Sequence, residues 1–148
     1  MNFIEEQLDC ASKVLALPVK AFRRCDNAAA AIIVRSAKNT FVLDNPRSWW
    51  MTLKYPSEYY DYSDGFGFED IQRHVPSGEE KCWFIPETEE EQLPVFDVEV
   101  KSIGLILGEC GYFEYYLVGK NYNWLIVEND HNQVIVSTVP VDDLSQRE

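Results

Sequence analysis

Residues 113–138 read FEYYLVGKNYNWLIVENDHNQVIVST, and this stretch decides the fold of the 148-residue chain. Three runs rich in β-branched and aromatic residues, at 113–118, 123–127 and 134–138, alternate with two short turns that contain Gly or Asn. Turns of this composition between such runs are typical of antiparallel strands joined by hairpins. The stretch therefore predicts a three-stranded meander within an antiparallel sheet.

Helical patterns precede the meander. Apolar residues recur at helical spacing over 3–15 and again over 96–109, which predicts two amphipathic helices. Asp26 is a good N-cap for a third helix that runs to about residue 39, although the β-branched residues at 32–34 also fit a strand. With the meander, these helices predict a single α+β domain over 1–148, in which an antiparallel sheet is packed with several helices.

The remaining segments carry weaker local patterns, which predict short elements and loops between the helices and the meander. They are a strand over 40–43, a helix opened by Asp44-Asn45-Pro46 and ended by Tyr55-Pro56, a loop over 57–67, a helical turn over 68–75, a strand over 81–85, a solvated loop over 87–92 and a frayed tail over 140–148.

Charge excludes several classes of partner. The chain has 25 acidic and 13 basic residues, a formal net charge of −12, and residues 57–100 hold 13 of the acids against Arg73 and Lys81. Such a field repels nucleic acid and anionic membranes and attracts basic proteins. No apolar stretch approaches the roughly 20 residues of a membrane helix, and acids stand where a signal peptide would be basic. We expect a cytoplasmic protein that binds neither nucleic acid nor membrane.

Cysteine and histidine spacing points away from metal and cofactor sites. The four cysteines include no closely spaced pair, and only two histidines are present, so we expect no bound metal and no cofactor. We expect buried or half-buried free thiols. Cys110 falls near the C-terminus of a predicted helix, where the dipole disfavours the thiolate that a catalytic cysteine needs.

Aromatic and acidic residues alternate between positions 55 and 66, and this segment is the predicted partner-binding site. Tyrosine combines a large rigid contact area with a polar tip, while neighbouring carboxylates complement a basic partner. The alternative is that the tyrosines cover the core as amphipathic side chains. The candidate residues are Tyr55, Glu58, Tyr59, Tyr60, Asp61, Tyr62, Asp64 and Phe66.

Two other acidic clusters have simpler interpretations. Glu87 and the run Glu89–Glu91 lack the spacing of a calcium loop, and we expect a solvated surface there. The segment 128–131 could form an acid/base pair, but turn chemistry explains its Asn and Asp residues. We expect Trp83 and Trp124 to lie in the core, and the tyrosines at 59–62 to be at least partly exposed.

The C-terminal third resembles the closing block of an uncharacterised bacterial family. The residues that carry this resemblance are Glu114-Tyr115-Tyr116-Leu117-Val118, then Trp124-Leu125-Ile126-Val127-Glu128-Asn129 and His131. The earlier Trp49-Trp50 and Cys82-Trp83-Phe84-Ile85 fit the same pattern. The arrangement is also similar, more loosely, to the SUKH immunity superfamily, small acidic α+β proteins that neutralise toxins in bacterial conflict.

That resemblance implies a non-catalytic protein that binds a basic toxin domain, such as a nuclease, and blocks its active site. Two other classes stay open from the residues alone. A small hydrolase with buried carboxylates would have a deep cleft with strongly perturbed acids. A regulatory or carbohydrate-binding module would have a shallow groove lined by aromatic rings.

Overall fold

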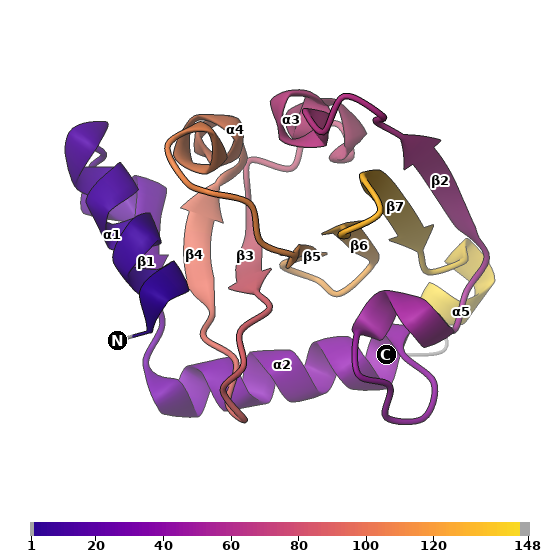
Figure 1. Ribbon diagram of the computed structural model, residues 1–148. Helices are drawn as coiled ribbons and strands as arrows, with labels where there is room; N and C mark the ends of the chain where they lie inside the picture. Colours follow the sequence, from indigo (N-terminus) through magenta and orange to yellow (C-terminus); the bar gives the residue numbers. More distant parts are fainter. Residues whose placement is uncertain (1, 146–148) are drawn as a thin grey trace.

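The computed structural model describes residues 2–145, which contain a seven-stranded antiparallel sheet. The strand order is β1-β4-β3-β5-β6-β7-β2, so β1 and β2 are the two edges (Figure 1). The strands are β1 Phe22–Arg24, β2 Ser57–Asp61, β3 Lys81–Pro86, β4 Phe96–Glu99, β5 Tyr115–Gly119, β6 Trp124–Glu128 and β7 Gln133–Thr138. The α+β prediction and the C-terminal meander are confirmed.

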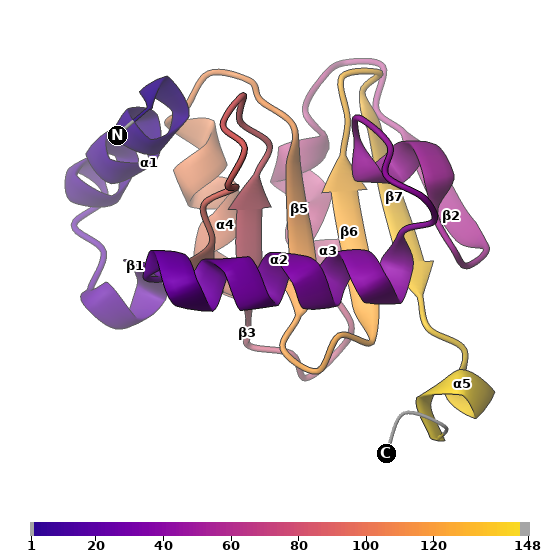
Figure 2. The same cartoon turned by 90° about the horizontal axis from the view of Figure 1, so that it is seen from below.

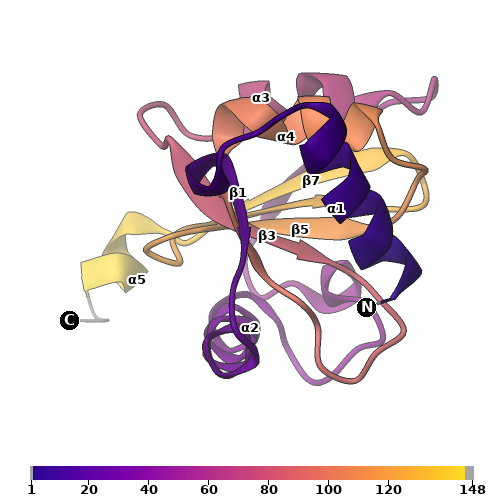
Figure 3. The same cartoon turned by 90° about the vertical axis from the view of Figure 1, so that its left-hand side faces the viewer.

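Helices cover both faces of this sheet. One face carries α1, α3 and α4, and α2 crosses the other face together with the 3₁₀ turn η2 (Figures 2 and 3). The bounds are α1 Phe3–Val14, α2 Asn27–Phe41, α3 Ile71–His74, α4 Val100–Gly108 and α5 Val141–Ser145, with 3₁₀ turns η1 Val19–Ala21, η2 Trp49–Thr52 and η3 Gly67–Asp70. Because both faces are covered, every residue of β5 and β6 is buried.

Successive residues of the central strands point into two different cores. Trp124 and Tyr115 face the layer of α1, α3 and α4, whereas Tyr116 and Leu125 face α2. Trp124 is fully buried, as predicted. Trp83 is only half-buried, so its prediction as a core residue was wrong; its ring packs against the α2-side core and lies 3.5 Å from the Lys120 ammonium.

The two N-terminal helices form where their local signals predict. Asn2 and Glu5 make a capping box at the start of α1, and the Asp26 side chain accepts a 2.7 Å bond from the Ala29 backbone at the start of α2. The alternative strand at 32–34 is wrong, because these residues lie within α2, whose buried residues Ala30, Ile33 and Ala37 recur at helical spacing.

Tertiary packing overrides the predictions for 40–56. The buried stripe of α2 continues through Ala37 to Phe41, so the expected strand over 40–43 is wrong and a single bridge joins Val42 to Leu53. The helix expected after Asp44 is also wrong: Asp44 has a φ of 59° instead of a capping conformation, and only the 3₁₀ turn η2 forms.

Two further predictions were wrong because sheet pairing adds strands that the local pattern hides. The expected helix over 96–109 starts with β4, which pairs with β1 and β3 before α4 begins at Val100. The expected loop over 57–67 contains β2, which pairs with β7. In the tail, residues 141–145 form the short helix α5 and residues 146–148 lie outside the described part, so the expected fraying stays a prediction.

The helical turn over 68–75 and the strand over 81–85 are confirmed by η3, α3 and β3. Within residues 2–145, none of the helices has both the length and the apolar character needed to cross a membrane.

The end of β5 leaves no room for a side chain, which gives a test of the packing. A Cβ added to Gly119 would lie 2.5 Å from the Nε1 of the buried Trp124, whose indole donates to Glu79. We expect Gly119→Ala to lower the free energy of unfolding by about 1–3 kcal/mol, because the indole must move. The matched control is Gly108→Ala in α4, where the nearest atom is 3.7 Å away and helix propensity favours alanine. Urea unfolding that shows equal effects for both would contradict this packing.

Candidate functional site

The candidate site lies at the end of the sheet where β3 ends and β5 begins. Pro86 pairs with Tyr115, and the next backbone contact is a 2.9 Å bond from Glu87 N to Glu114 O. Tyr115 in turn pairs with Glu128 of β6, which places the β6–β7 turn beside the same strand end. Three segments that are distant in the sequence therefore meet here.

These segments enclose an open groove of about 790 Å³. Its lining comes from the start of α1 and from four segments, at 47–51, 87–89, 112–114 and 130–131. Strand alternation directs Glu114 to the same face as Tyr116, the face covered by α2 and η2. The groove thus lies between η2 and the end of the sheet.

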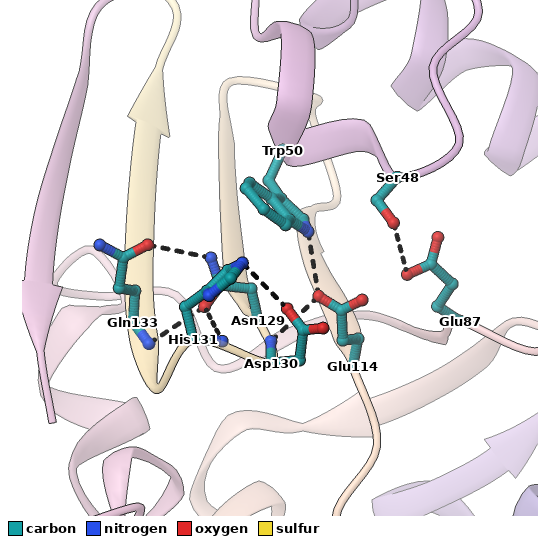
Figure 4. A network of polar contacts seen from close by, with 8 residues as sticks. All are labelled: Ser48, Trp50, Glu87, Glu114, Asn129, Asp130, His131 and Gln133. Atoms are coloured by element: carbon teal, nitrogen blue, oxygen red, sulfur yellow. Dashed lines mark hydrogen bonds and ion pairs between the residues drawn. The ribbon is translucent and has the colours of Figure 1, made fainter. Parts of the chain in front are cut away.

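Hydrogen bonds hold the polar side chains of the groove in place (Figure 4). The Glu114 carboxylate accepts a 2.9 Å bond from Trp50 Nε1 and a 3.2 Å bond from the Asp130 backbone. Ser48 Oγ donates a 3.2 Å hydrogen bond to the Glu87 carboxyl group. The His131 and Trp50 rings lie edge to face, with 5.5 Å between their centroids. The Glu114 carboxylate is therefore fixed against the Trp50 indole, and the neighbouring Glu87 carboxyl group is held by Ser48.

Asn129 sets the shape of the turn that carries Asp130 and His131. It is fully buried, and its Oδ1 accepts bonds of 3.0 and 3.1 Å from the backbones of His131 and Gln133. Its Nδ2 donates to the Gln133 side chain, which reaches Asp61 of β2 at 3.3 Å. The expected turn is confirmed, but its Asp130 and His131 also line the groove.

The pKa of Glu87 is raised to about 7. Burial is the main cause, and the hydrogen bond and negative charge of Glu114 add to it, while bonds with Tyr116 and Ser48 act in the opposite direction. Near neutral pH, Glu87 is consequently divided between its protonated and ionised forms. The expectation of a simple solvated surface fails at this residue, whereas Glu89–Glu91 are exposed as expected.

On the other face of the sheet, burial also raises the pKa of Glu128, although the 2.6 Å bond from the Tyr115 hydroxyl lowers it in part. A Cβ on Gly67 would come within 3.1 Å of this carboxyl group. Glu128 thus lies on the face covered by α1, α3 and α4 rather than in the groove.

The predicted binding segment lies mainly on the edge strand β2 instead of on a loop. Tyr59 is 55% exposed, and Tyr60 and Tyr62 are half-buried, so the expected partial exposure is confirmed. Tyr62 shares a 2.7 Å hydrogen bond with His74 Nε2, and the Tyr60 ring is 4.5 Å from the His74 ring.

The eight predicted residues do not form one cluster. Glu58 accepts a bond from the Tyr60 hydroxyl on the side of His74, whereas Asp61 joins the groove network through Gln133. Asp64 bonds the backbone of Phe66 in the following turn, and Tyr55 packs against the α2-side core.

Sequence reasoning missed Trp50, Glu87 and Glu114 as parts of one site. The available signal was that Glu87 directly follows one predicted strand and Glu114 lies at the start of another. Only the antiparallel pairing of these strands brings the two residues together, and that pairing is a non-local property.

The cysteines are free, with Cys25 and Cys82 buried, Cys110 half-buried and Cys10 exposed, so the burial prediction was wrong for Cys10. Burial, with smaller effects of Cys10 and Glu109, raises the pKa of Cys110 to about 11, which disfavours a thiolate as predicted. Among residues 2–145, no group of three or more His, Cys, Asp or Glu side chains is arranged to hold a metal ion.

A family model matches almost the whole chain. Residues 4–147 match the family described as "Family of unknown function (DUF6756)". No curated protein matches, and no solved structure matches.

The raised pKa of Glu87 predicts a pH-dependent stability. The folded protein holds this proton up to about pH 7, whereas the unfolded chain releases it near its ordinary pKa of 4.5. The folded state therefore binds more protons between these values, and this residue lowers the free energy of unfolding as pH rises through that range. We expect Glu87→Gln to remove this component, so that the variant gains stability relative to the natural protein between pH 4.5 and pH 7.

Urea unfolding across that range measures the effect, with Glu89→Gln on the exposed part of the same loop as the matched control. Identical pH profiles for the natural protein and Glu87→Gln would show that Glu87 is an ordinary surface carboxylate.

Proposed function

This chain belongs to DUF6756, a family of unknown function, and we propose that it is a non-catalytic acidic binding protein of the immunity type, which neutralises a basic toxin domain. The observation that carries the proposal is the convergence of four carboxyl groups in one open groove. They are Glu87, Glu89, Glu114 and Asp130, and Arg47 is the basic residue beside them.

The groove combines charge with apolar contact area. Tyr112 and Met51 at its margin are each 57% exposed, and Trp50 presents an indole ring whose nitrogen is already bound to Glu114. An arginine or lysine of a partner could pair with the carboxylates while its stem packs on these side chains. Aromatic and methionine side chains are enriched at the centre of protein interfaces, with polar and charged groups around them.

A nuclease toxin suits this surface, because it uses basic residues to hold phosphate groups. Carboxylates that occupy those basic residues would exclude the nucleic acid without any chemical step. The excess of acidic over basic residues in the segment 57–100 would also accelerate the encounter with such a partner.

One observation favours a second candidate, a small hydrolase. A carboxyl group that holds its proton near pH 7 beside another carboxylate has the protonation state that a general acid needs. In such an enzyme Glu87 would donate a proton to a leaving group, and Glu87→Gln would abolish the function. A binding protein would keep its function, because glutamine resembles the protonated carboxyl group in shape.

Co-expression tests the binding proposal. The probe is the product of the reading frame immediately upstream of this gene, expressed alone and together with this protein, and the proposal predicts that this product alone stops growth. We expect the natural protein and Glu87→Gln to restore growth, and the double variant Glu114→Gln/Asp130→Asn to protect at least about tenfold less well, since it removes two charges from the groove.

The matched control removes two exposed acids outside the groove, Glu90→Gln/Glu91→Gln, and should protect fully. Failure of the natural protein to protect would contradict the immunity proposal. Protection that Glu114→Gln/Asp130→Asn leaves unchanged would show that binding does not use the groove.

A further inference from the structure

The outer edge of β2 is an open pairing surface. β2 is the last strand of the sheet and pairs on one side with β7, and no other segment of residues 2–145 pairs with it on the other side (Figure 1). The opposite edge differs: β1 is only three residues long, and its Arg24 is bonded to Glu5 of α1 at 2.7 Å.

The register shows which backbone groups of β2 face outward. The Tyr62 backbone donates to Asn132 O at 2.8 Å, so Tyr62 belongs to the hydrogen-bonded positions of the β2–β7 ladder. In an antiparallel pair these positions alternate, which directs Tyr60 and Glu58 to β7 as well. The N–H and C=O groups of Tyr59 and Asp61 therefore point away from the sheet.

The side chains along this edge define the chemistry of its occupant. Glu58, Tyr59 and Asp61 are exposed. In the segment from β2 to the end of α3, acids outnumber bases by five to one: Glu58, Asp61, Asp64, Glu69 and Asp70 against Arg73. Strand alternation places Tyr59 and Asp61 on one face of the sheet and Glu58 on the other. A strand with alternating basic residues would satisfy the outward backbone groups and set its basic side chains beside Tyr59 and Asp61.

A second copy of this chain fits the edge poorly. Two β2 edges in one ladder would bring the carboxylates of Glu58 and Asp61 from both copies to a single seam, and like charges between paired strands are destabilising. Charge complementarity thus selects a basic partner over self-association.

We propose that β2 captures an extended basic segment of the partner, which adds to the sheet as an eighth strand beside Tyr59 and Asp61. The inference rests on the proposed function in one respect, the basic character of the partner. It deepens that function, because strand addition orients the bound protein, and the link from Asp61 through Gln133 to Asn129 joins this edge to the groove.

Amide hydrogen exchange by NMR tests the proposal residue by residue. The probe is a short alternating Lys-Val peptide blocked at both ends, and the control is the corresponding Glu-Val peptide. We expect the Lys-Val peptide to slow exchange at Tyr59 and Asp61 and to leave Glu58 and Tyr60, already bonded to β7, unchanged. The Glu-Val peptide should slow neither.

Two variants separate the backbone from the side chain. Tyr59→Pro removes the backbone N–H that points away from the sheet, at a position where an edge strand tolerates proline. We expect this variant to bind the Lys-Val peptide about tenfold more weakly. Tyr59→Ala removes the same ring and keeps the donor, so it should bind more tightly than Tyr59→Pro. The exchange pattern of the natural protein keeps the test valid if Tyr59→Pro does not fold.

Two outcomes would overturn the proposal. If the peptide shifts the NMR signals of Trp50 and Asp130 but does not slow amide exchange at Tyr59 and Asp61, basic segments bind in the groove alone. The proposed function would then still stand. Protection that grows with protein concentration in the absence of peptide would identify a second copy as the occupant. Loss of toxin protection in the co-expression test, with strand addition intact, would instead refute the proposed function alone.

Discussion

The pairing of β3 with β5 is the contact on which the rest of the structure depends. It joins the two halves of the chain, since β3 also pairs with β4 and β5 also pairs with β6. Its last residue pair, Pro86 with Tyr115, fixes the position of every side chain at that end of the sheet. A shift of one residue would turn Glu114 away from η2 and place Tyr115 in the wrong core.

The groove follows from this register. Two carboxyl groups that repel one another when ionised are kept adjacent because each has its own donors, Ser48 for Glu87, and Trp50 with the Asp130 backbone for Glu114. The protein accommodates the pair by retaining a proton on Glu87, whose pKa is raised mainly by burial. In the proposed complex, the neighbouring side chains of Glu114 and Asp130 would pair with the basic partner while Glu87 keeps its proton.

Local signals predicted the elements whose pattern is complete within one segment. The amphipathic spacing of α1, the cap at Asp26 and the apolar runs of the meander are of this kind. β2 and β4 were missed because their strand character comes from a neighbour: β2 is mostly exposed and β4 is apolar at helical spacing with α4. The site was missed for the same reason, as Glu87 and Glu114 meet only through the β3–β5 pair, whereas the aromatic segment at 55–66 was visible as composition.

The most direct test of this account is the titration of Glu87 itself, followed by NMR of its side-chain carboxyl carbon in the natural protein and in Glu114→Gln. The account predicts a midpoint near pH 7 in the natural protein. It predicts a lower midpoint in Glu114→Gln, still above 4.5 because burial remains the main cause. A midpoint near 4.5 in the natural protein would show that the two carboxyl groups do not meet, and would contradict the site described above.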